Sequence, residues 1–301
     1  MSPRDSRSFT GAACTWLVVL ATACSSSSTK PSDAGAPDGP SGDAAADAGL
    51  ADAAPESGGD SGVATAGSSI VILQLVGSTA SVADIVATFD PHYAAGLGCA
   101  RTVSGPCTVD DCTALDMQGA MLMGESAGTL TVSGALLPTA IMIHPGATGT
   151  YRQLLGGNPL FGAGDVFQVS TAGDVFAALT GQSAPGPAPV TITSPAMTMG
   201  TVGPTYTYDP TAALTWTWTG RQAGASVIVS VLTSAPDLTV TCTFDATAGT
   251  GTIPQDVVAK LPAMPSTLQI VAATSTMLAA GSQSVLFELE TGGEQSALAP
   301  Q

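Results

Sequence analysis

A strict alternation of apolar and polar residues limits what the C-terminal part of this chain can fold into. The stretches 214–219 (LTWTWT) and 238–244 (LTVTCTF) place threonine at every second position. Successive side chains of a β-strand point to opposite faces of the sheet, so a period of two predicts strands with one buried face. The stretch 285–290 (VLFELE) follows the same rule, and it would present Glu288 and Glu290 on a polar face.

The region from residue 67 onward also predicts short strands, separated by glycine and proline. Ser69–Val76 is apolar at consecutive positions, as in a strand buried on both faces. Ser81–Asp90 has a helix-like start, and Ile85, Val86 and Phe89 would share one helical face, so it predicts a short helix. Further strands are predicted at Ala120–Met123, Thr129–Ser133, Thr139–His144, Asp165–Ser170, Asp174–Leu179, Val190–Ser194, Thr205–Asp209, Ser226–Leu232 and Leu268–Ala272.

A proline-rich stretch, Gln182–Pro189 (QSAPGPAP), is typical of a linker between two domains, 67–181 and 190–293. The second range holds about seven short strands, a tryptophan-bearing third strand and a helical turn at Pro254–Leu261. This pattern resembles an immunoglobulin or fibronectin type III sandwich. The expected fold class is all-β: two β-sandwich-like domains with one or two short helices, after a disordered tether.

The first 24 residues have the pattern of an export signal. Two arginines precede the uncharged run Ala12–Ala23, which is too short to span a bilayer and has the length of a signal-peptide core. Small residues followed by Cys24 resemble a bacterial lipoprotein signal, although that family prefers leucine where this chain has Ala21. The resemblance implies a signal peptide over 1–23 and lipidation of Cys24.

Lipidation would connect the chain to the membrane through an N-terminal lipid anchor, and several acyl chains on one residue hold stably. In the lipoprotein family, serine rather than aspartate after the cysteine favours the outer membrane, and Ser25 stands there. We therefore expect a cell-envelope protein, anchored in the outer membrane. The alternative is an ordinary signal cut near Ala23, which would make the protein secreted or periplasmic.

Residues 24–66 predict a disordered linker between the anchor and the folded part. The segment is rich in Ala, Ser, Gly, Pro and Asp, and it has almost no large apolar residue beyond Leu50. Such a composition cannot bury enough apolar surface to offset the entropy of the chain. We interpret it as a spacer that holds the folded part away from the membrane.

The charge of the chain excludes one class of partner. Seven basic residues stand against 23 acidic ones, for a net charge of −16, and no cluster of basic residues occurs anywhere. Nucleic-acid binding needs a basic patch, so we expect no nucleic-acid partner.

The cysteines beyond the anchor predict disulfides. These residues are Cys99, Cys107, Cys112 and Cys242. An even number in an exported protein indicates a disulfide framework. Of the three pairings, we favour one bridge inside the 99–112 loop and a second from the remaining loop cysteine to Cys242. The alternative, a zinc site with His92, lacks the closely spaced cysteine pair usual for zinc, so we predict no metal site.

One motif suggests catalysis. Gly124–Gly128 (GESAG) resembles the nucleophile elbow of carboxylesterases, with Ser126 as the nucleophile. That chemistry needs a strand-to-helix turn and a histidine base, whereas a strand pattern follows here and His144 is the only later histidine. We interpret the motif as a turn between strands, His144 as a strand-end residue and His92 as a loop residue.

Four aromatic residues have two interpretations. They are Trp216, Trp218, Tyr206 and Tyr208, on two predicted strands. Aromatic faces can stack on sugar rings, so they form a candidate ligand platform. The other interpretation, which continues the inward period of Leu214, places them in the core of the sandwich.

These observations together predict a non-catalytic cell-envelope lipoprotein with a structural or binding role and no cofactor. The candidate partners are a polysaccharide or another envelope protein. The alternative is a serine hydrolase that uses Ser126.

Overall fold

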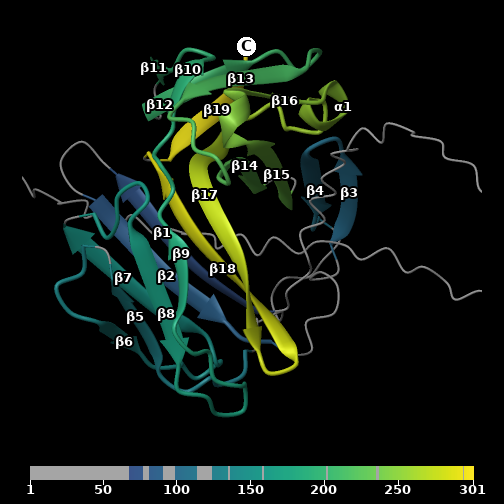
Figure 1. Cartoon of the computed structure of the whole chain (residues 1–301). Helices are drawn as coiled ribbons and strands as arrows, with labels where there is room; N and C mark the ends of the chain where they lie inside the picture. Colours follow the sequence, from purple (N-terminus) through teal and green to yellow (C-terminus); the bar gives the residue numbers. More distant parts are fainter. Residues whose placement is uncertain are drawn as a thin grey trace, which may run out of the picture.

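The computed structural model describes residues 68–76, 81–90, 99–113, 124–134, 136–157, 159–200, 203–234, 237–293 and 295–301 (Figure 1). The predictions for Cys24, the 24–66 linker, His92 and Ala120–Met123 lie outside these residues. In the part of the chain that the structure describes, no helix is long and apolar enough to cross a membrane.

Three β-sheets make up the fold. The large sheet has twelve strands, in the order β3 (Ala100–Ser104), β4 (Cys107–Asp111), β15 (Asp237–Asp245), β14 (Ser226–Ser234), β17 (Ser266–Ala280), β18 (Gln283–Gly292), β1 (Ser68–Val76), β2 (Ser81–Thr88) and β7 (Tyr151–Gly157). Its remaining strands, β19 (Ser296–Pro300), β12 (Gly203–Tyr208) and β11 (Thr198–Gly200), join through β17.

The two smaller sheets have four and three strands. The four-stranded sheet is β6 (Ile141–Ile143), β5 (Leu130–Gly134), β8 (Val166–Thr171) and β9 (Gln182–Pro185). The three-stranded sheet is β10 (Thr191–Ser194), β13 (Leu214–Thr219) and β16 (Thr250–Ile253). The only helical elements among the described residues are a single turn of 3-10 helix at Ala246–Ala248 and α1 (Gln255–Val258). The all-β prediction is confirmed.

Both smaller sheets pack on the same face of the large sheet, which we call its inner face. The four-stranded sheet encloses one core with this face, and we call that pair of layers the N-terminal sandwich. The three-stranded sheet encloses a second core, and we call that pair the C-terminal sandwich. The long strand β17 runs through both, because Leu268 lies in the second core and Leu278 in the first (Figure 1).

Strands from both halves of the sequence share each sandwich. β1 pairs in parallel with β18, so that Ile70 lies beside Phe287. β4 pairs with β15, so that Cys107 lies beside Cys242. The two cores therefore do not follow the predicted division into 67–181 and 190–293.

The C-terminal sandwich has the strand arrangement of an immunoglobulin-type fold. β10, β13 and β16 form one sheet, and β15, β14, β17 and β19 lie in the other. In such folds the first, second and fifth strands share one sheet and the third, sixth and seventh share the other. The helical turn predicted at Pro254–Leu261 is also present, and it buries Val257 and Val258.

The predicted helix at Ser81–Asp90 is wrong, because this segment forms strand β2. It pairs with β1 on one side and with β7 on the other. Ala83, Ile85 and Ala87 are buried in the first core, which is a period of two. The two non-local ladders satisfy its backbone groups, and they outweigh a weak local preference for helix.

Three other predictions need correction. Asp174–Leu179 is not a strand but a bend that buries Phe176, with the Thr171 N–H donating to the Leu179 carbonyl at 3.0 Å. The predicted linker begins as strand β9, which pairs with β8. The predicted cysteine loop is a hairpin of β3 and β4.

Candidate functional site

The GESAG segment is a tightly held turn that leads into β5. The Glu125 N–H donates to the Phe89 carbonyl at 2.6 Å, and the Phe176 N–H donates to the Ser126 carbonyl at 3.0 Å. Gly128 has a φ of +73° and ends the turn, and a Cβ at this position would lie 2.8 Å from the Gly173 carbonyl oxygen. The segment is followed by a strand rather than a helix, so it lacks the geometry of a nucleophile elbow.

Tyr151 on β7 holds this turn through its hydroxyl group. Its hydroxyl accepts a hydrogen bond from the Ala127 N–H at 2.8 Å and donates one to the Gly128 carbonyl at 2.7 Å. The Tyr151 ring is fully buried and packs edge-on against Phe89, with their centroids 5.4 Å apart. The backbone polar groups of the motif are thus occupied in holding the loop.

Ser126 and His144 have separate local partners. The Ser126 hydroxyl accepts a hydrogen bond from the Gly128 N–H at 3.2 Å, as in a serine turn. His144 is exposed, and its Nδ1 lies 3.3 Å from the Thr129 hydroxyl. Among the described residues, no hydrogen bond joins Ser126 to His144.

The aromatic strand lies in the core, so the ligand-platform interpretation of Trp216 and Trp218 is wrong and the core interpretation is confirmed. Their side chains are 0% and 2% exposed. The Trp218 Nε1–H donates to the Ala246 carbonyl at 3.0 Å. The Trp216 Nε1–H has no hydrogen-bond partner among the described residues. Tyr206 packs edge-on against Trp216, with their centroids 5.1 Å apart.

Tyr208 is also buried, and its hydroxyl donates to the Pro262 carbonyl at 3.0 Å. Tyr206 is partly buried against the same core. Burial raises the pKa of both tyrosines above the ordinary value. Trp216, Trp218 and Tyr208 are therefore too deeply buried to stack on a sugar ring.

The opposite side of the aromatic strand is a surface of hydroxyl groups, which we call the threonine face. It consists of alternate residues on β10, β13 and β16 that point away from the core: Thr191, Thr193, Thr215, Thr217, Thr219, Thr250 and Thr252. Neighbouring strands are linked through these side chains, with 2.7 Å between the Thr193 and Thr217 hydroxyls and 3.0 Å between those of Thr215 and Thr252. These alternate positions carry no charged residue.

Both disulfides lie at the edge of the large sheet that belongs to the C-terminal sandwich. Cys99 and Cys112 close the β3–β4 hairpin, and Cys107 joins β4 to Cys242 on β15. The predicted pairing, one bridge in the loop and one to Cys242, is confirmed. A group of three or more His, Cys, Asp or Glu side chains suited to a metal ion does not occur in the described part of the chain.

The large sheet has an outer face, which carries neither sandwich core. Two glutamates that the sequence alternation predicts to be in solvent lie on this face. Glu288 is only 8% exposed, and Glu290 beside it is partly buried. Burial raises the pKa of Glu288 to about 7. Burial and then the charge of Glu288 raise the pKa of Glu290 well above its ordinary value.

The strands beside these glutamates offer no cation. Glu290 lies between Leu73 and Ala273, and Glu288 lies between Val71 and Ser275. On the next strand, Asp84 is buried too, but Arg152 on β7 neutralises it through a 2.8 Å ion pair. The sequence could have indicated that Glu288 and Glu290 lack a cation, because β1 and β17 contain no basic residue.

Comparisons with known proteins add little to this description. No family model matches the chain, and no curated protein matches it. A solved structure with some similarity is the chicken CNTN1 FN1–FN3 domains, at 10% identity and a TM-score of 0.19, covering 75% of this chain and 66% of that chain. The fold assignment therefore rests on the strand order described above.

Proposed function

We propose that this chain is a non-catalytic lipoprotein of the cell envelope, whose β-rich ectodomain binds a neutral polysaccharide through the threonine face. The threonine face is the single observation that carries the proposal. A hydroxyl group both donates and accepts hydrogen bonds, so a row of threonines can match the hydroxyl groups of a sugar chain. The methyl groups beside them supply apolar contact.

The charge of the protein supports a neutral partner. With a net charge of −16, the chain repels polyanions over distances comparable to the Debye length, about 8–10 Å at physiological salt. The threonine positions carry no charge of their own. A neutral polysaccharide can approach this face without electrostatic cost, whereas an anionic polymer would be disfavoured.

Two structural features support a rigid binding body. β17 is shared by both sandwiches, and the bridge between Cys107 and Cys242 fixes the edge of the large sheet. Rigid surfaces bind with a smaller loss of conformational entropy than surfaces that must be ordered on binding.

Binding can be tested with the full-length protein and a panel of neutral glucans: dextran, amylose and a soluble β-glucan. The variant Thr215→Val/Thr219→Val removes two exposed hydroxyls of the threonine face and keeps the side-chain shape. The control Thr243→Val/Thr267→Val removes two exposed hydroxyls from strands of the large sheet. We expect binding that only the first variant loses. Absence of binding, or equal binding by both variants, would contradict polysaccharide binding by the threonine face and leave an envelope protein as the candidate partner.

The anchor part of the proposal is supported by the run of small residues before Cys24. Metabolic labelling with a fatty-acid analogue should mark the wild-type protein and not Cys24→Ala. Labelling that persists in the variant would contradict the lipid anchor.

The serine-hydrolase alternative is supported by the GESAG motif alone. A fluorophosphonate probe should leave both the wild-type protein and Ser126→Ala unlabelled. Labelling of the wild type that Ser126→Ala abolishes would overturn the non-catalytic proposal.

A further inference from the structure

The methionines of the described residues are placed opposite to the usual pattern. All five in the described residues are exposed, by 68% for Met142, 54% for Met197, 79% for Met199, 54% for Met264 and 41% for Met277. No methionine is among the buried apolar residues of the described chain, which are aliphatic, aromatic, alanine or disulfide-bonded cysteine. Methionine is ordinarily among the residues most often buried, so this distribution calls for a cause.

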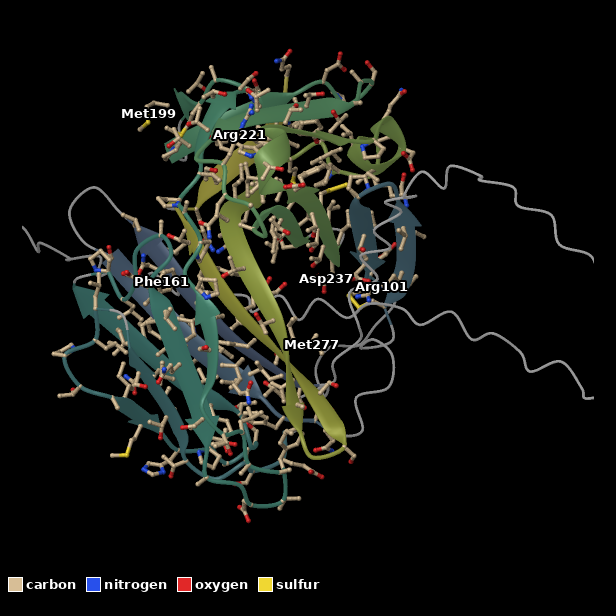
Figure 2. All side chains as sticks on the ribbon, viewed as in Figure 1. Arg101, Phe161, Met199, Arg221, Asp237 and Met277 are labelled. Atoms are coloured by element: carbon tan, nitrogen blue, oxygen red, sulfur yellow. A yellow bond between two sulfur atoms is a disulfide. The ribbon has the colours of Figure 1, made fainter. Side chains whose placement is uncertain are left out.

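The exposed thioethers do not form one docking surface. Met142 points outward from β6 in the four-stranded sheet, which covers the inner face of the large sheet. Met277 lies on the outer face, since its neighbour Leu278 belongs to the core on the inner face. Met199 lies on the small β11 strand at another part of the molecule (Figure 2). One macromolecular partner cannot cover these opposite sides, whereas a small diffusible reagent reaches all of them.

The cysteines and tryptophans of the described chain are protected from oxidants. Its four cysteines are joined in disulfides, so they present no thiol. Trp216 and Trp218 are buried. The thioether sulfurs are therefore the accessible two-electron reductants of the folded ectodomain.

We propose that these five methionines are sulfoxidation sites at which the ectodomain consumes peroxide-class oxidants without losing its fold. The sulfur lone pair attacks one oxygen of hydrogen peroxide, the O–O bond breaks and a sulfur–oxygen bond forms. The sulfur is oxidised by two electrons. The second peroxide oxygen leaves as hydroxide and takes up the proton of the transferred oxygen, so that water is released. The product is a polar methionine sulfoxide, which disrupts a core but is readily solvated at the surface.

The test exposes the full-length protein to hydrogen peroxide and follows each methionine by peptide mass spectrometry, with thermal unfolding in parallel. We expect one oxygen at each of the five sites, with Met199 reacting ahead of Met277, and an unchanged unfolding midpoint. A variant with leucine at all five positions should show the same midpoint and no uptake there.

A matched control places a thioether in the core. Leu278 is 2% exposed, and Leu278→Met conserves volume. Its introduced sulfur should resist peroxide in the folded protein, and once oxidised after unfolding it should lower the midpoint on refolding. The proposal is overturned if the five surface sites resist peroxide, or if their oxidation lowers the midpoint as oxidation of the control does.

Discussion

The two sandwiches use the same large sheet but differ in how their strands are ordered along the chain. The C-terminal sandwich takes most of its strands from one continuous stretch, and hairpins such as β14–β15 join neighbours directly. The N-terminal sandwich is completed by the parallel pair of β1 with β18, which lie near opposite ends of the described chain. Both disulfides hold strands of the C-terminal sandwich, and none holds the described strands of the other.

Local hairpins and disulfides therefore support the C-terminal sandwich. The N-terminal sandwich depends instead on apolar contacts between strands that are far apart in the sequence. Closing a long loop costs entropy before its contacts form. We therefore expect the N-terminal sandwich to depend strongly on the C-terminal strand β18, and the two sandwiches to unfold together because β17 and β18 connect them.

The largest expected effect comes from Phe287→Ala. Phe287 is fully buried on β18 between β17 and β1, and removal of a buried phenylalanine costs about 3–5 kcal/mol. Urea unfolding of residues 67–301, which exclude Trp16, followed by tryptophan emission reports Trp216 and Trp218 in the other sandwich. We expect that signal to shift as well, with Val103→Ala, at an exposed position, as a control. An unshifted tryptophan transition would show that the sandwiches unfold independently.

The disulfides distinguish the two regions by covalent support. The bridge between Cys107 and Cys242 spans 135 residues, whereas the bridge between Cys99 and Cys112 spans 13. On the loop-entropy argument, Cys107→Ser/Cys242→Ser should cost about 3–5 kcal/mol in urea unfolding, and Cys99→Ser/Cys112→Ser should cost less. A larger loss from the short bridge would contradict this account of the C-terminal sandwich.

Acidity should stabilise the shared sheet through Glu288. Its folded-state pKa of about 7 lies above the ordinary value of 4.5, so the folded state favours the proton. The stabilisation from this bound proton is fully present below pH 4.5. It is lost as the pH rises from 4.5 to about 7, and no more is lost above that. The total is about 3 kcal/mol, at 1.36 kcal/mol per pKa unit. Unfolding free energies of the wild type and Glu288→Gln should converge in acid and diverge toward neutral pH, with the variant more stable at neutral pH. Parallel curves would contradict the burial of this carboxyl.

A smaller effect is expected from Gly292→Ala, at the end of β18 near the junction of the sandwiches. A Cβ there would lie 2.5 Å from the Ile270 carbonyl oxygen and 2.8 Å from Val271 Cγ1. Crowding of this kind costs about 1–3 kcal/mol. At Gly293 an added Cβ meets nothing within 4 Å, so Gly293→Ala serves as the control in the same unfolding measurement. Equal stability of both variants would contradict close packing at the junction.

The parts of the fold that could be predicted from sequence are those that local residues determine. The alternation in β13 and β15 is local and reports one buried face directly, so these strands and the core position of Trp216 could be found from sequence. The sequence of β2 predicts a helix because Ile85, Val86 and Phe89 have helical spacing after a helix-like start, whereas its pairing with β1 and β7 is set by distant residues. The same limit hides the parallel pair that places β18 in the N-terminal sandwich.

The candidate sites could likewise be predicted only where local sequence determines them. The disulfide pairing could be predicted because four cysteines allow only three pairings, and the structure has one of them. The burial of Glu288 could not be found, because a period of two shows which residues share a face and not what covers that face. The threonine face was visible as alternation, but only the order β10–β13–β16 brings its members together.

Native-state hydrogen exchange of the full-length protein, resolved by peptide mass spectrometry, tests the shared sheet most directly. If β17 and β18 unite the sandwiches, the slowest amides of β1 and β2 should open with the same free energy as those of β13 and β14, and that value should equal the global free energy of unfolding. A clearly lower opening free energy in one sandwich, with the other still protected, would contradict a single cooperative unit.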